Sequence, residues 1–318
     1  MVSFPPVVVD LLRIDANIQR FHRATAAAGC QVRAHVKAHR TAELAQRQVA
    51  AGAVGVAVHT ASAAVRLAEA GVQDIVLAWP WPDAWRFPLF ADAAATIPRF
   101  AIHVDRPESI TGIGAAATER DTEVGVRIDL RHTPAESALA LARLAVDTTG
   151  VRFDGLSGYC PTATADEIRD RYEVGRRYAQ SVVAVAEALR DAGIDCPVVS
   201  VGGTPTAPGA CGVDGVTEIC AGVYASFDGG LAAAGVCAPT DVALSVAADA
   251  TELLDGCAQH WDAGVAWMPA ASPYSDRLVP AHVCPLAANL LKYGVEITVV
   301  ADGEQVATWR PFAAPDRV

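Results

Sequence analysis

Eight short apolar segments alternate with alanine-rich stretches over the first 235 residues. The segments fall at 32–36, 54–59, 75–79, 100–104, 124–130, 153–159, 198–201 and 218–225. Helical patterns such as 42–51, 61–70, 134–147 and 166–192 lie between them. A helix after each strand is typical of βα units, and eight such units close into a parallel barrel. We therefore predict an α/β fold with a (β/α)8 TIM-type barrel over residues 12–235.

The pattern changes after residue 235. Short alternating segments follow at 242–247, 264–268, 277–279, 295–300 and 304–309, and Asp302-Gly303 is a hairpin turn signal between the last two. This pattern predicts a smaller C-terminal β domain over residues 236–318. Residues 1–11 contain an apolar segment and are a candidate extra strand of that domain.

Composition excludes several classes of protein. With 52% hydrophobic and 19% charged residues, the chain can bury a large core, so disorder is excluded. The net charge of −11, without a basic stripe, argues against nucleic acid and anionic membranes as partners. No apolar run approaches the ~18–20 residues of a membrane span, and residues 1–10 lack the regions of a signal peptide. The eight cysteines form no CxxC pair, so we expect reduced thiols and a cytoplasmic protein.

The end of the first predicted strand carries His35, Lys37 and His39. Function in such barrels lies at the carboxyl ends of the strands. The alternation of a strand predicts that these three side chains share one face. Burying a lysine at this position is costly unless the residue has a functional role. Schiff-base chemistry requires a buried lysine of this kind. A lysine in an ion pair at the rim is the plainer alternative.

A glycine-rich segment, residues 201–206, follows the seventh predicted strand. Gly202 and Gly203 let backbone N–H groups approach an anion, and Thr204 adds a hydroxyl group. Gly222 and Tyr224 on the eighth strand can complete the same site. Loops at this position commonly bind phosphate, although the motif alone also fits an ordinary turn. A lysine with a phosphate site indicates a phosphorylated aldehyde cofactor, pyridoxal 5'-phosphate.

His282 and Cys284 form an HxC motif in the C-terminal part. In an extended strand, residues two apart face the same side, so the imidazole and the thiolate can reach one ion. Nitrogen and sulfur donors suit zinc. A buried cysteine beside a structural histidine is the alternative for an isolated motif. Structural roles are also expected for His103 and His260.

Several segments, taken together and in order, resemble the D-threonine aldolase/D-serine dehydratase family, whose fold is of the alanine-racemase type (fold type III). The segments are residues 33–39, 41–55, 153–159, 201–206, 218–228 and 279–285. The resemblance implies that pyridoxal phosphate is bound covalently to Lys37, which also acts as a base, with His35 and His39 beside it. It implies contacts from Tyr159, Arg131 and His59 to the cofactor ring. The cofactor phosphate is assigned to Gly202, Gly203, Thr204, Gly222 and Tyr224. His282 and Cys284 are assigned to a divalent metal, zinc or alternatively manganese.

The implied function is a lyase that acts on a small D-β-hydroxy amino acid, as a homodimer. Dehydration of D-serine or a 3-hydroxy-D-amino acid to a keto acid and ammonia is favoured, because HxC resembles the dehydratases and the aldolases more often carry HxD. The alternatives are D-threonine-aldolase-type cleavage to glycine and an aldehyde, and a racemase-type or non-catalytic cofactor-binding relative. A metal-dependent hydrolase without pyridoxal phosphate, using His35, His39 and His59, is a further alternative.

Overall fold

The computed structural model describes residues 5–160, 162–262, 264–274 and 276–312. Its larger part is a closed barrel in which eight strands follow one another in chain order, from β2 to β9. The strands are β2 Gln31–His35, β3 Gly55–Val58, β4 Asp74–Leu77, β5 Arg99–Val104, β6 Val124–Asp129, β7 Val151–Tyr159, β8 Val198–Gly202 and β9 Glu218–Ala221. Neighbouring strands are parallel, and β2 pairs with β9 to close the barrel. The predicted barrel is confirmed.

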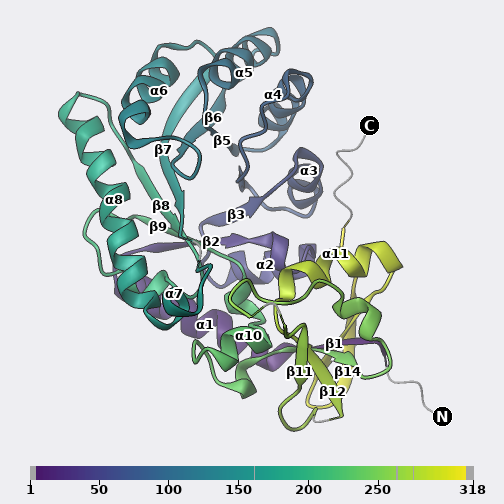
Figure 1. Ribbon diagram of the computed structural model, residues 1–318. Coiled ribbons are helices and arrows are strands. Elements are labelled where there is room, and N and C mark those ends of the chain that lie inside the picture. The colour runs from purple at the N-terminus through teal and green to yellow at the C-terminus, as the bar shows by residue number, and fades with distance from the viewer. Residues whose placement is uncertain (1–4, 161, 263, 275, 313–318) are drawn as a thin grey trace.

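Amphipathic helices cover the outside of the barrel (Figure 1). The longer ones are α1 Leu11–Ala27, α2 Ala42–Ala50, α3 Ala61–Glu69, α4 Phe87–Thr96, α5 Pro107–Glu119, α6 Ala135–Asp147 and α8 Arg171–Asp191. Most of them bury alanines among larger apolar side chains, as α3 does with Ala64 and Leu67, which are both fully buried. Small side chains let these helices pack closely on strands whose Val, Ile and Leu residues are buried as well.

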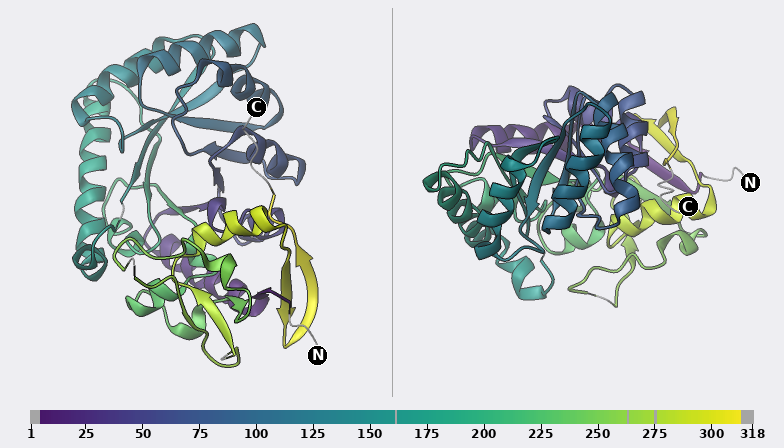
Figure 2. Two further views of the ribbon diagram at one scale, coloured as in Figure 1. Left: turned by 45° about the vertical axis from the view of Figure 1, so that its right-hand side comes forward. Right: turned by 90° about the horizontal axis from the view of Figure 1, so that it is seen from above.

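A second sheet lies beside the barrel and has the strand order β11-β12-β10-β1-β13-β14 (Figure 2). Its strands are β1 Val7–Asp10, β10 Leu244–Ala247, β11 Trp267–Pro269, β12 Arg277–Pro280, β13 Ile297–Ala301 and β14 Glu304–Trp309. Strand β1 pairs with β10 in antiparallel and with β13 in parallel orientation, so the candidate N-terminal strand belongs to this sheet. Asp302 and Gly303 both have positive φ between β13 and β14, as the hairpin signal predicts.

One helix of the second part has no counterpart in the predicted pattern. Helix α11, Val283–Tyr293, follows β12 and packs beside the 3-10 turn η1, Val36–Ala38, which carries Lys37 (Figure 1). This contact brings the HxC segment to the barrel mouth. No helix in the described ranges combines the length and apolar character needed to cross a bilayer.

Candidate active site

A cavity of about 290 Å³ lies at the carboxyl ends of the barrel strands. The barrel contributes Lys37, Tyr159 and Gly203 to its lining, and the C-terminal part contributes His282 and Cys284. Three candidate motifs that are far apart in the sequence therefore open onto one space. Its size suits a small cofactor with a small substrate.

Lys37 does not lie on a strand. Strand β2 ends at His35, whose Nδ1 accepts a hydrogen bond from the backbone N–H of Lys37 at 3.4 Å, and the chain then turns into η1. His35 and Lys37 line the cavity, but His39 does not. The prediction that all three share one face is wrong, because the strand alternation stops at the turn. His39 is buried beside Thr41, whose hydroxyl lies 3.1 Å from its Nδ1.

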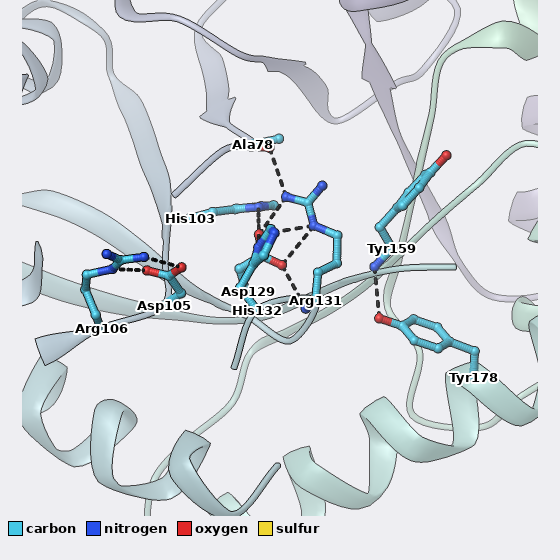
Figure 3. Close-up of polar contacts among 9 residues, drawn as sticks. All are labelled: Ala78, His103, Asp105, Arg106, Asp129, Arg131, His132, Tyr159 and Tyr178. Carbon is cyan, nitrogen blue, oxygen red and sulfur yellow. Dashed lines mark hydrogen bonds and ion pairs between the residues drawn. The ribbon is translucent and has the colours of Figure 1, made fainter. Parts of the chain in front are cut away.

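Tyr159 stands beside the lysine, with its ring centre 5.7 Å from Lys37 Nζ. Its backbone N–H donates to the Tyr178 hydroxyl at 3.1 Å, which fixes the end of β7 (Figure 3). Arg131 also approaches this ring, with its Cζ 5.9 Å from the Tyr159 ring centre. Two cationic side chains thus lie within about 6 Å of the centre of this aromatic ring.

Arg131 is held by a buried carboxylate, Asp129 at the end of β6. Arg131 Nη2 lies 2.6 Å from Asp129 Oδ2, and His132 and His103 approach the same oxygen at 3.3 and 3.7 Å (Figure 3). Burial alone raises the pKa of Asp129, but its contacts with His103 and Arg131 outweigh burial and hold that pKa well below its usual value. Asp129 is therefore an anion that orients the guanidinium. His103 lines the cavity, so its interpretation as a core histidine is too narrow.

Neutral imidazoles form one wall of the cavity. The rings of His35 and His59 meet edge to face, with their centres 4.8 Å apart. Burial, together with the charge of Lys37, lowers the pKa of His59 to about 3. Burial and the same charge also lower the pKa of His35 well below its usual value. The ring of Trp79 lies 5.8 Å from that of His59, so the wall continues into the loop after β4.

The glycine-rich loop forms a cradle at the end of β8. Gly203 has φ 123°, which side chains rarely adopt, and a Cβ there would lie 2.5 Å from Thr206 Oγ1. Thr204 Oγ1 is buried without a hydrogen-bond partner, as expected for a group that meets a ligand. The Gly203 N–H donates to the Cys220 carbonyl oxygen at 3.1 Å, so this glycine contributes its conformation and not a donor.

Gly222 completes this cradle from the end of β9. It lies so close to the His35 carbonyl oxygen that a Cβ would clash with it. The structure places Tyr224 elsewhere. Its side chain is fully buried against α1 and α2, where its hydroxyl lies 2.9 Å from His22 Nε2 and accepts from Gln48 Nε2 at 3.0 Å. The prediction of Tyr224 as a phosphate ligand is wrong, because the chain leaves β9 for the 3-10 turn η3, Val223–Ala225, which turns this residue away from the cavity.

The HxC motif lies at a helix start and not in a strand. His282 is the N-cap residue of α11, and Cys284 lies in its first turn. The assumption of an extended strand is therefore wrong, yet both side chains line the cavity. Burial lowers the pKa of His282 to about 4 and raises that of Cys284 to about 11, while the charge of Lys37 lowers both values. Within the described ranges, no three or more His, Cys, Asp or Glu side chains form a ready metal site, so the motif offers two protein donors.

Gln259, His260 and Asp228 are among the cavity residues that carried no functional prediction. The ring of His260 lies 5.9 Å from that of His282, so its interpretation as a structural histidine is too narrow. These residues lie in loops or at a helix cap without a recurrent spacing. The one signal was Asp228, which ends the resembling segment 218–228.

Comparisons with known proteins agree with this geometry. A family model described as the alanine racemase N-terminal domain matches residues 9–225. D-threo-3-hydroxyaspartate dehydratase of Delftia sp. (strain HT23) is 36% identical over 77% of this chain and 66% of its own length. D-threonine aldolase of an Arthrobacter species is 30% identical over 72% of this chain and 62% of its own length. The chain thus spans somewhat less than two thirds of these relatives.

A solved structure matches almost the whole chain. It is a cysteine-to-alanine variant of D-threo-3-hydroxyaspartate dehydratase in its metal-free form, with a TM-score of 0.83, 27% identity and 98% coverage of both chains. The family resemblance drawn from the motifs is confirmed, and the fold of this family implies pyridoxal phosphate as the cofactor. The chain belongs to the alanine racemase N-terminal domain family.

Proposed function

We propose that this protein is a pyridoxal-phosphate- and divalent-metal-dependent lyase that dehydrates a D-β-hydroxy amino acid to a keto acid and ammonia. One observation supports this most: Lys37, the glycine cradle and the His282–Cys284 pair open onto one cavity. The relatives that are named as a dehydratase and an aldolase of such substrates support the same reaction class.

The cavity fits the cofactor. Thr204 Oγ1 is a buried polar atom without a partner, and the close approaches at Gly203 and Gly222 leave no room for a Cβ. These three residues, with Gly202, would hold the phosphate, and Lys37 would hold the aldehyde carbon. When bound, pyridoxal phosphate supplies an electron sink for a carbanion at the substrate Cα.

The residues around Lys37 define its role. Its amine, freed when substrate binds, would take the proton from the substrate Cα, since it is the only lysine among the cavity-lining residues. The Tyr159 ring and the Arg131 guanidinium would fix the plane of the cofactor ring. The imidazoles of His35 and His59 remain neutral and would donate or accept hydrogen bonds without adding charge.

His282 and Cys284 would hold the metal ion. One nitrogen and one sulfur donor suit zinc, with manganese as the alternative, and leave positions open for water or substrate. An ion there would supply a Lewis acid for a substrate hydroxyl group. The similar dehydratase is described in a metal-free form, which supports a metal in enzymes of this kind.

The geometry disfavours the hydrolase alternative. A site built from His35, His39 and His59 would need all three imidazoles in one space, and His39 does not line the cavity. Aldolase-type cleavage stays a second candidate, because the similar Arthrobacter protein is named as a D-threonine aldolase.

One assay separates these reactions. The purified protein, loaded with pyridoxal phosphate and zinc, is incubated with D-serine, D-threonine and 3-hydroxy-D-aspartate, and keto acid and aldehyde are measured separately. We expect keto acid with ammonia, dependent on metal and abolished by Lys37→Ala. Aldehyde with glycine would support the aldolase, and no product from any substrate would refute both.

A further inference from the structure

Asp228 is a buried carboxylate between the barrel and the HxC turn. It is 0% exposed and lines the cavity at the N-cap of α10, Gly229–Ala233. Its Oδ1 accepts from the Leu231 N–H at 2.9 Å and from Gln259 Nε2 at 3.2 Å. Its Oδ2 accepts from the Val283 N–H at 3.2 Å, across 55 residues of sequence. Helix capping needs only the first of these contacts, so the second oxygen has another role.

Val283 is the residue between the two proposed metal ligands. Its N–H belongs to the first turn of α11 and has no partner within that helix, so Asp228 satisfies it. The residue before His282 is held as well, because Ala281 O accepts from Gly230 N in α10 at 3.0 Å and from Gln259 Nε2 at 2.7 Å. A Cβ at Gly230 would clash with that oxygen, so the close approach requires a glycine.

These contacts fix the peptide groups on both sides of His282. Gln259 bridges them, since one amide group donates to both Asp228 and Ala281. All donors to the Asp228 carboxylate are neutral N–H groups. Burying a charged carboxylate among neutral donors alone is unfavourable. Electrostatic attraction to a nearby cation would offset that cost.

We propose that Asp228, together with Gln259, is a positioning residue that sets the His282–Cys284 turn for metal binding and couples it to the end of the barrel that holds the cofactor. The inference rests on the proposed function, because it assumes a metal at these ligands. Asp228 acts through the Val283 peptide and does not itself bind the ion. Residues that orient metal ligands from outside typically contribute about 10–100-fold to metal affinity.

Asp228→Asn tests the carboxylate with little change in shape. Asparagine is an equally good helix cap, so its oxygen can keep the Leu231 contact. Its NH2 group then faces the Val283 N–H, and two donors oppose each other. A matched control is Asp10→Asn, because Asp10 caps α1 by accepting from the Arg13 N–H at 3.1 Å and does not line the cavity.

The experiment is a cobalt titration of the protein with pyridoxal phosphate bound, after removal of metal by a chelator. Co²⁺ bound to a thiolate gives a charge-transfer band, so the band reports Cys284 as a ligand independently of turnover. We expect Asp228→Asn to weaken Co²⁺ binding by about tenfold or more and to weaken this band. Cofactor absorbance and Tm should stay close to those of Asp10→Asn.

Several outcomes would overturn the proposal. One is a cobalt affinity and band in Asp228→Asn within twofold of wild type. The absence of a thiolate band in the wild-type protein also overturns it. Cys284 would then not bind the metal, and Asp228 would have no metal ligand to position. If Asp228→Asn does not fold, Gln259→Leu decides, since it removes both bridging bonds and should weaken cobalt binding in the same way. If cobalt binding weakens in Asp228→Asn as expected but the wild-type protein has no lyase activity, the proposed function is refuted and this inference stands.

Discussion

The guanidinium of Arg131 is held in place by Asp129, with Nη2 and Oδ2 2.6 Å apart, while its Cζ lies 5.3 Å from the ring centre of Trp79. The pair carries no net charge, so Arg131 offers the cavity a fixed donor plane instead of a mobile cation. A second, more exposed pair lies nearby, because Arg106 Nε donates to Asp105 Oδ1 at 2.7 Å (Figure 3). The two pairs make a matched comparison.

Asp129→Asn should lower kcat/KM by about tenfold or more, because the guanidinium loses its orienting partner. It should also destabilise the fold by roughly 3–5 kcal/mol, the usual result of breaking a buried ion pair. Steady-state kinetics and urea unfolding measure both effects. Asp105→Asn is the control, and an equal loss in both variants would contradict a specific role for Asp129.

Lys37→Ala should remove the visible absorbance of the covalently bound cofactor and lower turnover by about 10²–10⁴-fold, since no other lysine lines the described cavity. Spectra of the protein after reconstitution with pyridoxal phosphate check the first part, and keto acid release checks the second. An unchanged spectrum would exclude Lys37 as the attachment site.

Tyr224→Phe should leave cofactor affinity unchanged, because the Tyr224 hydroxyl bonds to His22 and Gln48 outside the cavity. The same change should cost about 1–3 kcal/mol of stability, since it leaves buried polar groups without a partner. Cofactor titration and denaturant unfolding measure the two effects. A weaker cofactor affinity at unchanged stability would instead support Tyr224 as a ligand of the cofactor phosphate.

Cys284→Asp should keep a metal site but change its preference. A carboxylate is a harder ligand than a thiolate, so the ratio of bound manganese to zinc should rise. Elemental analysis after incubation with both ions measures this ratio, and Cys284→Ala is the control that should lose metal. Equal zinc in wild type and Cys284→Ala would remove Cys284 from the site.

Stability should fall as the pH drops below 6.5. Burial lowers the pKa of His39 from 6.5 to about 4, so between these values the unfolded chain binds a proton that the folded chain does not. The contribution of His39 is complete above pH 6.5 and is lost progressively toward pH 4, by on the order of 3 kcal/mol. Urea unfolding at several pH values measures this loss. In His39→Asn this part of the pH dependence should disappear.

The barrel and the second sheet were predictable, because strand and helix periodicities are local. Even β1 was visible as an apolar segment, although its neighbours β10 and β13 lie far along the chain. Residue type was enough to select Lys37, Gly203 and Cys284, which all line the cavity. The site was not predictable where a strand gives way to a 3-10 turn. The turns at η1 and η3 displaced His39 and Tyr224 from the cavity, because alternation does not report where a strand ends.

The loop residues were missed for a different reason. Gln259 and His260 reach the cavity through the packing of α11 against η1, a contact between segments more than two hundred residues apart. No spacing within either segment encodes that contact. The same packing brings the HxC motif to the cavity, although the motif lies at a helix start and not in the predicted extended strand.

The central position of β1 in the second sheet has a consequence for the order of synthesis. Val8 pairs with Ser245 on one side and with Thr298 on the other. On the ribosome, β1 emerges before the eight barrel strands, whereas its neighbours β10 and β13 emerge after them. The barrel can therefore close before the sheet beside it exists. The sheet is then completed late, around a strand that was made before the barrel.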